Sequence, residues 1–159
     1  MVPELSPIAH LFALDDRMLD RLVGDFAAGD WRVRDGAGHT PRWITGHVAT
    51  HRLRLVGLMG MPPLAASWTA AFGRGTSDAD VPEEFDMKTA IQGFHDAHER
   101  IAQRWEQLTP ADLAQPFGRT LPDGSDTLGG AIRFLAWHEA YHFGQLGLLR
   151  RLAGKPGLA

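Results

Sequence analysis

Cysteine is absent from the 159 residues of this chain. Its absence excludes disulfide bonds, a thiolate nucleophile of the protein's own and cysteine-type zinc sites, so histidine and carboxylate groups are the only strong metal ligands available. Lysine occurs only at Lys88 and Lys155, and the formal net charge is −3. Because no overall positive field attracts nucleic acid or an anionic membrane, we expect neither as a partner.

Long hydrophobic runs are also missing. No apolar stretch approaches the roughly 20 residues that a membrane-spanning helix needs. The N-terminal sequence MVPELSPIAHLFALDD lacks the basic start and the long apolar run of a signal peptide. These absences predict a cytoplasmic protein, and the length predicts a single domain over residues 1–159.

Strand-like alternation of apolar and polar residues is not sustained anywhere, whereas four segments repeat apolar residues with a helical period. The second segment opens with Thr40 as a helix cap and Pro41 at the first helical position. A small hairpin is predicted around 122–124, where Pro, Asp and Gly follow one another. The four predicted helices cover approximately residues 6–27, 40–59, 86–108 and 126–152.

The four amphipathic segments predict an all-α protein, folded as a four-helix bundle. Their second connection, residues 60–83, is rich in Gly, Pro and Ala and has some 24 residues. Antiparallel neighbours need only a short loop, whereas a connection of this length can run back along the bundle. The second and third helices are therefore predicted to be parallel.

Residues 138–142 read HEAYH, the H-E-x-x-H pattern of zinc metalloproteases. His138 and His142 lie one turn apart, so their rings leave the same helix face. A protease of this kind needs a third protein ligand, usually downstream, and the tail after His142 contains no His, Asp or Glu. No predicted strand precedes the motif to hold an extended substrate. The motif therefore indicates a metal site and not a protease.

The third ligand has to come from another helix. Two imidazoles on an apolar helix face are costly unless hydrogen bonds or a metal satisfy them, and a pair one turn apart favours the metal. The candidates for the third ligand are His47, His51 and His98. His47 and His51 are themselves one turn apart, so a site of four histidines is conceivable. Spacing alone does not choose among these residues.

The chain resembles the DinB/YfiT-like superfamily of metalloenzymes over almost its whole length. The resemblance rests on four helices of similar length, on W-x-x-x-H from Trp43 to His47, and on H-x-x-x-H-x-x-Q-L from His138 to Leu146. It implies a bundle of up-down-down-up order, which agrees with the long second connection. By analogy with the family, a homodimer is also expected.

The resemblance further implies a divalent metal, typically nickel or zinc, held by His47, His138 and His142 with solvent completing its shell. His51 is not at a ligand position of the family, and we expect its ring to point to solvent. Three neutral imidazoles leave the metal its full charge and an open position, which is typical of a catalytic site. Such a metal lowers the pKa of a bound water or thiol.

Better-understood members of the family use small-molecule thiols, so the resemblance implies an enzyme that uses or transfers a small thiol, with an electrophilic substrate as its partner. Three alternatives remain open. One is a hydrolase that uses metal-bound hydroxide, another is a non-catalytic metal-binding protein of a stress response, and the last is a structural bundle without metal. Metal analysis separates the last of these from the others.

Two residues of the motif are candidates for catalysis, Glu139 as a general base and Gln145 as a hydrogen-bond donor to a ligand or substrate. One helical step turns Glu139 about 100° away from His138, so a surface or inter-helix carboxylate is the other interpretation. Asp15 falls on the apolar stripe of the first helix. It is predicted either to orient a ligand imidazole or to be solvated.

Overall fold

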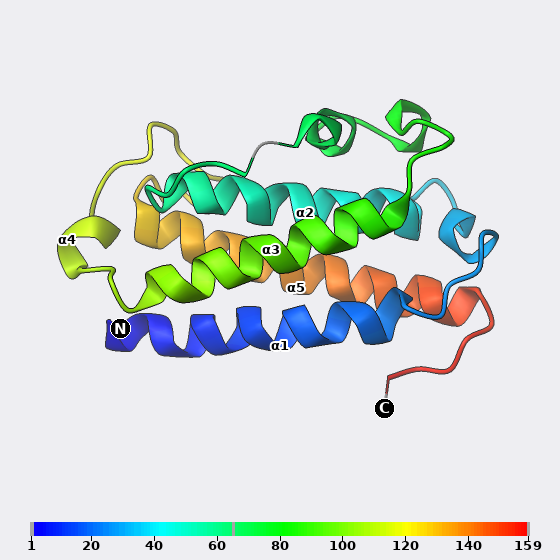
Figure 1. Cartoon of the computed structure of the whole chain (residues 1–159), viewed down its shortest axis with the longest axis horizontal. Coiled ribbons are helices and arrows are strands. Elements are labelled where there is room, and N and C mark those ends of the chain that lie inside the picture. The colour runs from blue at the N-terminus through cyan, green and yellow to red at the C-terminus, as the bar shows by residue number, and fades with distance from the viewer. Residues whose placement is uncertain (1, 65, 159) are drawn as a thin grey trace.

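The computed structural model describes residues 2–64 and 66–158, and these residues fold as a bundle of four long helices (Figure 1). The long helices are α1 (Ser6–Val23), α2 (Pro41–Leu58), α3 (Met87–Trp105) and α5 (Leu128–Leu152). Short helical turns lie between them: η1 (Pro3–Leu5), η2 (Asp30–Arg32), η3 (Ser67–Phe72), η4 (Asp78–Asp80) and α4 (Pro110–Leu113). The described residues contain no β-strand, so the predicted all-α bundle is confirmed.

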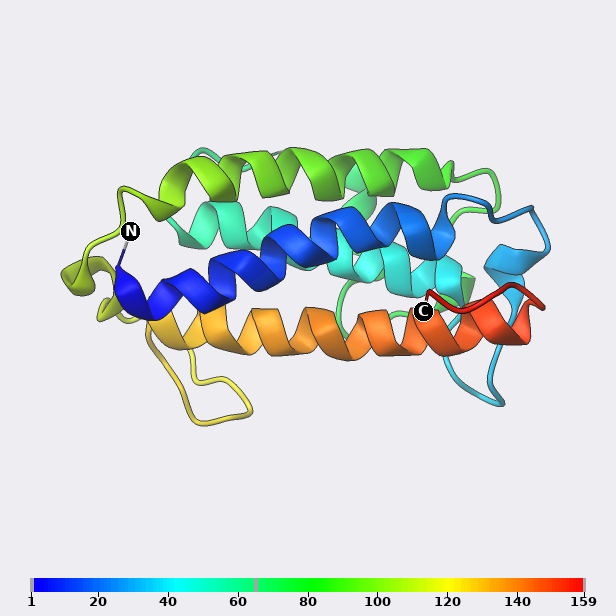
Figure 2. The same ribbon diagram turned by 90° about the horizontal axis from the view of Figure 1, so that it is seen from below.

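The direction of each helix follows from the colours of Figure 1, in which α1 and α5 run one way and α2 and α3 the other. Residues 59–64 and 66–86 lie between the two parallel helices in the chain and run back over the bundle. Helix α2 contacts α3 and α5, and α1 contacts the same two helices, so the four form a closed ring (Figure 2). Helices α2 and α5 are therefore neighbours although residues 59–127 separate them in the chain.

Side-chain caps fix where the long helices begin. The hydroxyl of Thr40 accepts from the amide of Trp43, the carboxylate of Asp86 from that of Lys88, and the hydroxyl of Thr127 from that of Gly130. These caps satisfy amides that the first helical turn leaves without partners. The predicted starts of the second, third and fourth helices are thus confirmed.

The predicted end of the first helix, near residue 27, is wrong. Helix α1 ends at Val23, and the amide of Phe26 bonds back only to the Val23 carbonyl, in a single turn. The amide of Ala27 donates to the carboxylate of Asp30 at 2.7 Å. Because Asp30 takes this amide, the helical hydrogen-bond pattern cannot continue.

The third helix ends at Trp105, three residues before its predicted end. Thr109 and Asp112 form a reciprocal cap that starts the short helix α4, for which no helix was predicted. The hairpin predicted around 122–124 is present, closed by a single antiparallel bridge between Pro116 and Thr127. It projects from the start of α5 (Figure 2).

Two clusters of buried apolar side chains fill the bundle, one toward each end. Phe12, Ile101 and Ile132 belong to the first cluster, and Leu19 and Phe143 belong to the second. Polar side chains lie at the level where the clusters meet, and the histidines of α2 and α5 are among them. None of the described helices combines the length and the apolar character that a membrane crossing requires.

Candidate metal centre

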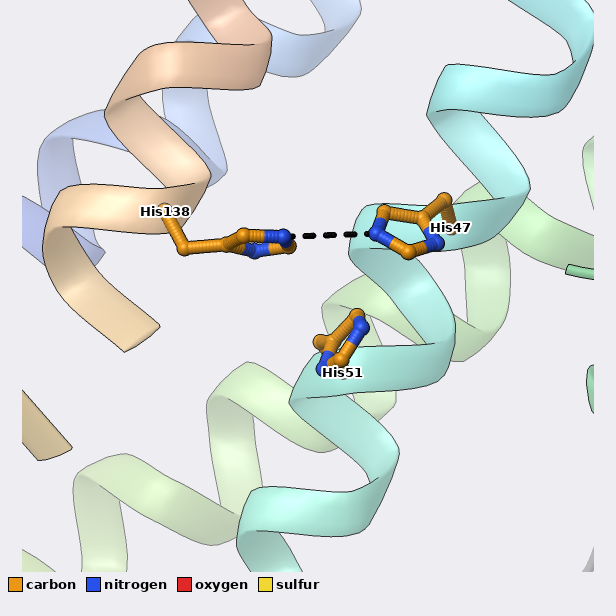
Figure 3. Close-up of side chains that lie close together, drawn as sticks. All are labelled: His47, His51 and His138. Atoms are coloured by element: carbon orange, nitrogen blue, oxygen red, sulfur yellow. Dashed lines mark hydrogen bonds between the residues drawn. The ribbon is translucent and has the colours of Figure 1, made fainter. Parts of the chain in front are cut away.

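Four histidines converge between α2 and α5. His47, His51 and His138 turn their rings toward one another (Figure 3), and one nitrogen from each lies within 4.8 Å of the others. The Nε2 atom of His138 is also 3.3 Å from Nε2 of His47 and 3.1 Å from Nε2 of His142. Nε2 of His138 is therefore close to Nε2 of both other ligands implied by the resemblance, whereas the group of nitrogens that all lie within 4.8 Å of one another contains His51 and not His142.

His51 does not point to solvent as expected. Its ring is half-buried, with its centre 4.5 Å from that of His47 and 4.7 Å from that of His138. The reason is that α2 is buried on nearly all sides, so a residue one turn beyond His47 also faces α5. His98, the other candidate, lies on α3 and does not belong to the group of nitrogens formed by His47, His51 and His138.

The outward-facing nitrogens of two of these rings are held by hydrogen bonds. His47 donates its Nδ1–H to the carbonyl of Phe72 at 2.7 Å, and His142 donates its Nδ1–H to Oε1 of Gln145 at 2.7 Å. Metal-binding histidines usually donate their other ring N–H in this way, which fixes both the tautomer and the ring orientation. For His51, no such bond occurs among the described residues.

These hydrogen bonds leave unprotonated ring nitrogens facing one another, and a bound cation would relieve their repulsion. With the proton on Nδ1, both His47 and His142 present an unprotonated Nε2 toward Nε2 of His138. A single proton on His138 can be donated to only one of them, so one pair of nitrogens would face each other through lone pairs. The donor set of three neutral imidazoles thus fits a divalent metal of the kind that imidazole binds well.

Burial keeps these histidines uncharged. The pKa of His47 is lowered to about 3 and that of His138 to about 4, mainly by burial and in part by the neighbouring imidazoles. Burial likewise lowers the pKa of His51 to about 2. At neutral pH the rings are therefore available to a metal without first losing a proton.

The same shifts make the stability of the metal-free protein depend on pH. A histidine whose pKa is lowered on folding binds a proton only in the unfolded state below pH 6.5, so stability falls as the pH drops. We expect His51→Leu to remove the part of this pH dependence that His51 causes. The free energy of unfolding of the variant, relative to the original protein, should rise by about 1 kcal/mol from about pH 7.5 to about pH 5.5. Urea unfolding with a chelator present measures the difference, and a value independent of pH would contradict it.

A glycine allows the carbonyl of Phe72 to reach His47. A Cβ atom added at Gly46 would lie 2.3 Å from the Phe72 ring, which is fully buried against α2. Because no side chain intervenes, η3 packs closely on α2 and brings its last carbonyl to the imidazole. This group could not be predicted, because a backbone carbonyl leaves no signal in a sequence.

Gly46→Ala is therefore expected to disturb both stability and metal binding. The added methyl group has to displace the Phe72 ring, which should lower the free energy of unfolding by about 1–3 kcal/mol. It should also weaken metal binding, because the ring of His47 loses its anchor. Gly57→Ala is the matched control, since it lies on the same helix with open space around its Cβ position. If both variants behave alike in urea unfolding and metal titration, the close packing of η3 on Gly46 contributes neither to stability nor to metal binding.

The structure places Glu139 away from solvent, in a buried ion pair with Arg52. Oε1 and Oε2 of Glu139 accept from Arg52 at 2.5 and 2.9 Å, and both side chains are almost completely buried. Burial raises the pKa of Glu139, Arg52 opposes this shift, and the neighbouring carboxyl of Asp15 adds to it. To serve as the predicted general base, Glu139 would have to leave Arg52.

Asp15 and Gln145 also differ from expectation. Asp15 is buried beside Glu139 and Arg52 and does not orient an imidazole. Gln145 contacts the ring of His142, but it does so as an acceptor through its oxygen, and its Nε2 donates to the hydroxyl of Tyr141 at 3.2 Å. Tyr141 was not predicted to take part, although it is the only tyrosine of the chain and directly precedes His142.

Comparison with known proteins agrees with the four-helix fold. A family model described as the DinB superfamily matches residues 11–146. Among solved structures, the chain is similar to YfiT from Bacillus subtilis, described as a probable metal-dependent hydrolase with an unusual four-helix bundle topology. The TM-score is 0.72 at 18% sequence identity, over 98% of this chain and 91% of that one. The search of curated protein sequences found no significant match.

Proposed function

The chain belongs to the DinB superfamily, and we propose that it is a metal-dependent enzyme that activates a small-molecule thiol for attack on an electrophilic substrate. The observation that carries the proposal is the meeting of three neutral Nε2 atoms, from His47, His138 and His142, with two of the rings held from behind by hydrogen bonds. The imidazole donors suit nickel or zinc.

A divalent metal bound only by neutral imidazoles keeps its full charge and stabilises an anionic sulfur or oxygen beside it. The protein's own residues supply the orientation. The Phe72 carbonyl fixes the ring of His47, and Gln145 fixes that of His142. The exposed hydroxyl of Tyr141 accepts from Gln145 and holds the amide in the orientation that His142 requires.

The surroundings of the histidines favour a thiol over water as the attacking group. A divalent metal lowers the pKa of either bound group, but a thiol starts from a pKa of about 8.5 and water from about 15.7, so the thiol ionises near neutral pH more readily without a positioned base. Glu139, the carboxylate adjacent to His138 in the chain, is bound at both oxygens by Arg52, and Gln145 is an amide that cannot take up a proton. The absence of cysteine from the chain fits a thiol that arrives as a cosubstrate.

A hydrolase is the second candidate, and the similarity to YfiT favours it. In that case water takes the place of the thiol, and Glu139 would have to exchange Arg52 for the reacting water. The two candidates share the metal ligands and differ only in the attacking group.

Thiol binding to the cobalt-substituted protein distinguishes them. We expect a low-molecular-weight thiol to produce a sulfur-to-cobalt charge-transfer band and the same protein to speed addition of that thiol to a simple electrophile. His142→Ala should abolish both effects, whereas His39→Ala, whose ring stacks on Trp43, should not. If azide perturbs the spectrum and no thiol of a cellular panel does, the thiol proposal is wrong and hydrolysis becomes the better candidate.

A further inference from the structure

A hollow of about 640 Å³ lies beside the first half of α5, where the hairpin projects from the bundle (Figure 2). Its volume is in the range of pockets that hold small molecules. Three of its lining residues are apolar, and the other two carry charge. They are Pro122, Phe134 and Trp137, with Asp123 and Arg133. No residue of this hollow has a place in the metal centre or in the proposed chemistry.

Trp137 is the most exposed of the large hydrophobic side chains in the described part of the chain, at 60%. An indole in water lacks the stabilisation that burial of its large apolar surface gives, so an exposed indole at the edge of a hollow indicates a surface that a ligand covers. Its ring contacts that of Phe134, with ring centres 5.7 Å apart and planes at 44°. The two rings together offer an apolar surface on which a flat group can stack.

Phe134 joins the hollow to the metal centre. Its ring is stacked on that of His138, with ring centres 6.0 Å apart and planes at 25°. Because Phe134 precedes His138 by one helical turn, a molecule in the hollow has to extend only about 6 Å along α5 to reach the level of His138. A substrate held in the hollow can therefore place another part of itself at the metal centre.

The hairpin forms the outer wall of the hollow as a turn of fixed geometry. The amide of Gly124 donates to the carbonyl of Leu121 at 2.9 Å, and the amide of Leu121 donates to the carbonyl of Ser125 at 2.7 Å. Gly124 has a φ of 83°, a conformation that a side chain would strain. Pro122 and Asp123 lie inside this turn, so the hollow is formed before any ligand binds.

The two charged residues of the hollow differ in their partners. Oδ1 of Asp123 accepts from the amide and the hydroxyl of Ser125, at 3.1 and 2.7 Å, within its own turn. The exposed Arg133 interacts with Asp123 through charge but has no hydrogen bond among the described residues. Its guanidinium is thus available to a ligand, and it suits a carboxylate, which it binds through two parallel hydrogen bonds.

We propose that this hollow binds the electrophilic substrate, and that the substrate is an aromatic acid whose ring stacks on Trp137 and Phe134 while its carboxylate pairs with Arg133. Its role as the substrate site rests on the proposed function, whereas the binding of an aromatic acid does not. With the ring and the carboxylate held in the hollow, the reactive part of the substrate extends along α5 toward His138. Trp137 and Arg133 then determine which electrophiles the protein accepts.

Calorimetric titration of the metal-loaded protein with naphthoate, and with the neutral naphthamide, tests the site. We expect Trp137→Ala to weaken the binding of both molecules by about tenfold, because both lose the ring on which they stack. Arg133→Gln should weaken only the binding of naphthoate, by about 3- to 10-fold, because naphthamide has no charge to pair. Leu148→Ala and Arg151→Gln are the matched controls. Both residues are exposed on α5 outside the hollow, and their variants should leave both affinities unchanged.

A carboxylate also binds metals directly, and His142→Ala distinguishes that case. Binding in the hollow should persist in this variant. Naphthoate that does not bind at millimolar concentration would overturn the proposal, and so would binding that is lost with His142→Ala but retained with Arg133→Gln. If naphthoate binds as expected and no thiol perturbs the cobalt spectrum, the binding site in the hollow is supported and only the thiol chemistry is wrong.

Discussion

His47→Ala is expected to weaken the binding of a divalent metal by more than about 100-fold, and His138→Ala and His142→Ala should do the same. Each ring supplies one of the three proposed ligand nitrogens between α2 and α5, so a variant that lacks one ring holds the metal through only two of these imidazoles. Removing an imidazole also leaves solvent as a weaker ligand in its position. Competition with a chromophoric chelator at neutral pH measures the affinity of each variant.

His51→Ala makes this experiment decisive about the choice of ligands. His51 is close enough to belong to the group, but no hydrogen bond of its ring is found in the described part of the chain. We therefore expect a loss much smaller than that of His47→Ala. An equal loss would make His51 a ligand, either in place of His142 or beside it.

Arg52→Met is expected to lower the free energy of unfolding by about 3–5 kcal/mol, the largest effect on stability that we predict. The guanidinium is completely buried, binds both oxygens of Glu139 and the carbonyl of Phe12, and lies 3.7 Å from the centre of the Phe94 ring. Methionine fills much of the same space, but it leaves the carboxyl group of Glu139 buried without its cationic partner.

The double variant Arg52→Met, Glu139→Leu separates the charge effect from packing. Because it removes both members of the pair, most of the lost stability should return. Urea unfolding of the single and double variants at neutral pH gives the comparison. If the double variant is no more stable than the single one, the loss arises from packing around Phe94 and not from the unpaired carboxyl group.

The helices and the histidine pairs could be predicted from the sequence because their signals are local. Thr40, Asp86 and Thr127 act on amides two or three residues away, and an i, i+4 pair such as His138 and His142 shares a face in any helix. The long second connection indicated that α2 and α3 run the same way, as they do in Figure 1.

The surroundings of the site could not be predicted, because they depend on packing between distant segments. Arg52 follows His51 in a stretch with Arg54, which in sequence suggests a solvated basic face. In the fold α2 is enclosed on nearly all sides, so Arg52 is buried and needs Glu139 from α5. The same enclosure turns His51 inward, and the anchoring of His47 depends on a carbonyl at Phe72.

A metal-loaded crystal structure with anomalous scattering tests the central claim most directly. We predict one strong anomalous peak per chain, between α2 and α5, at about 2.0–2.1 Å from Nε2 of His47, His138 and His142. The remaining position should hold solvent or an added thiol. Two results would contradict this claim: no peak after loading at neutral pH, or a metal bound by His51 without His142. Either would mean that the rings oriented by Phe72 and Gln145 are not the ligands that we propose.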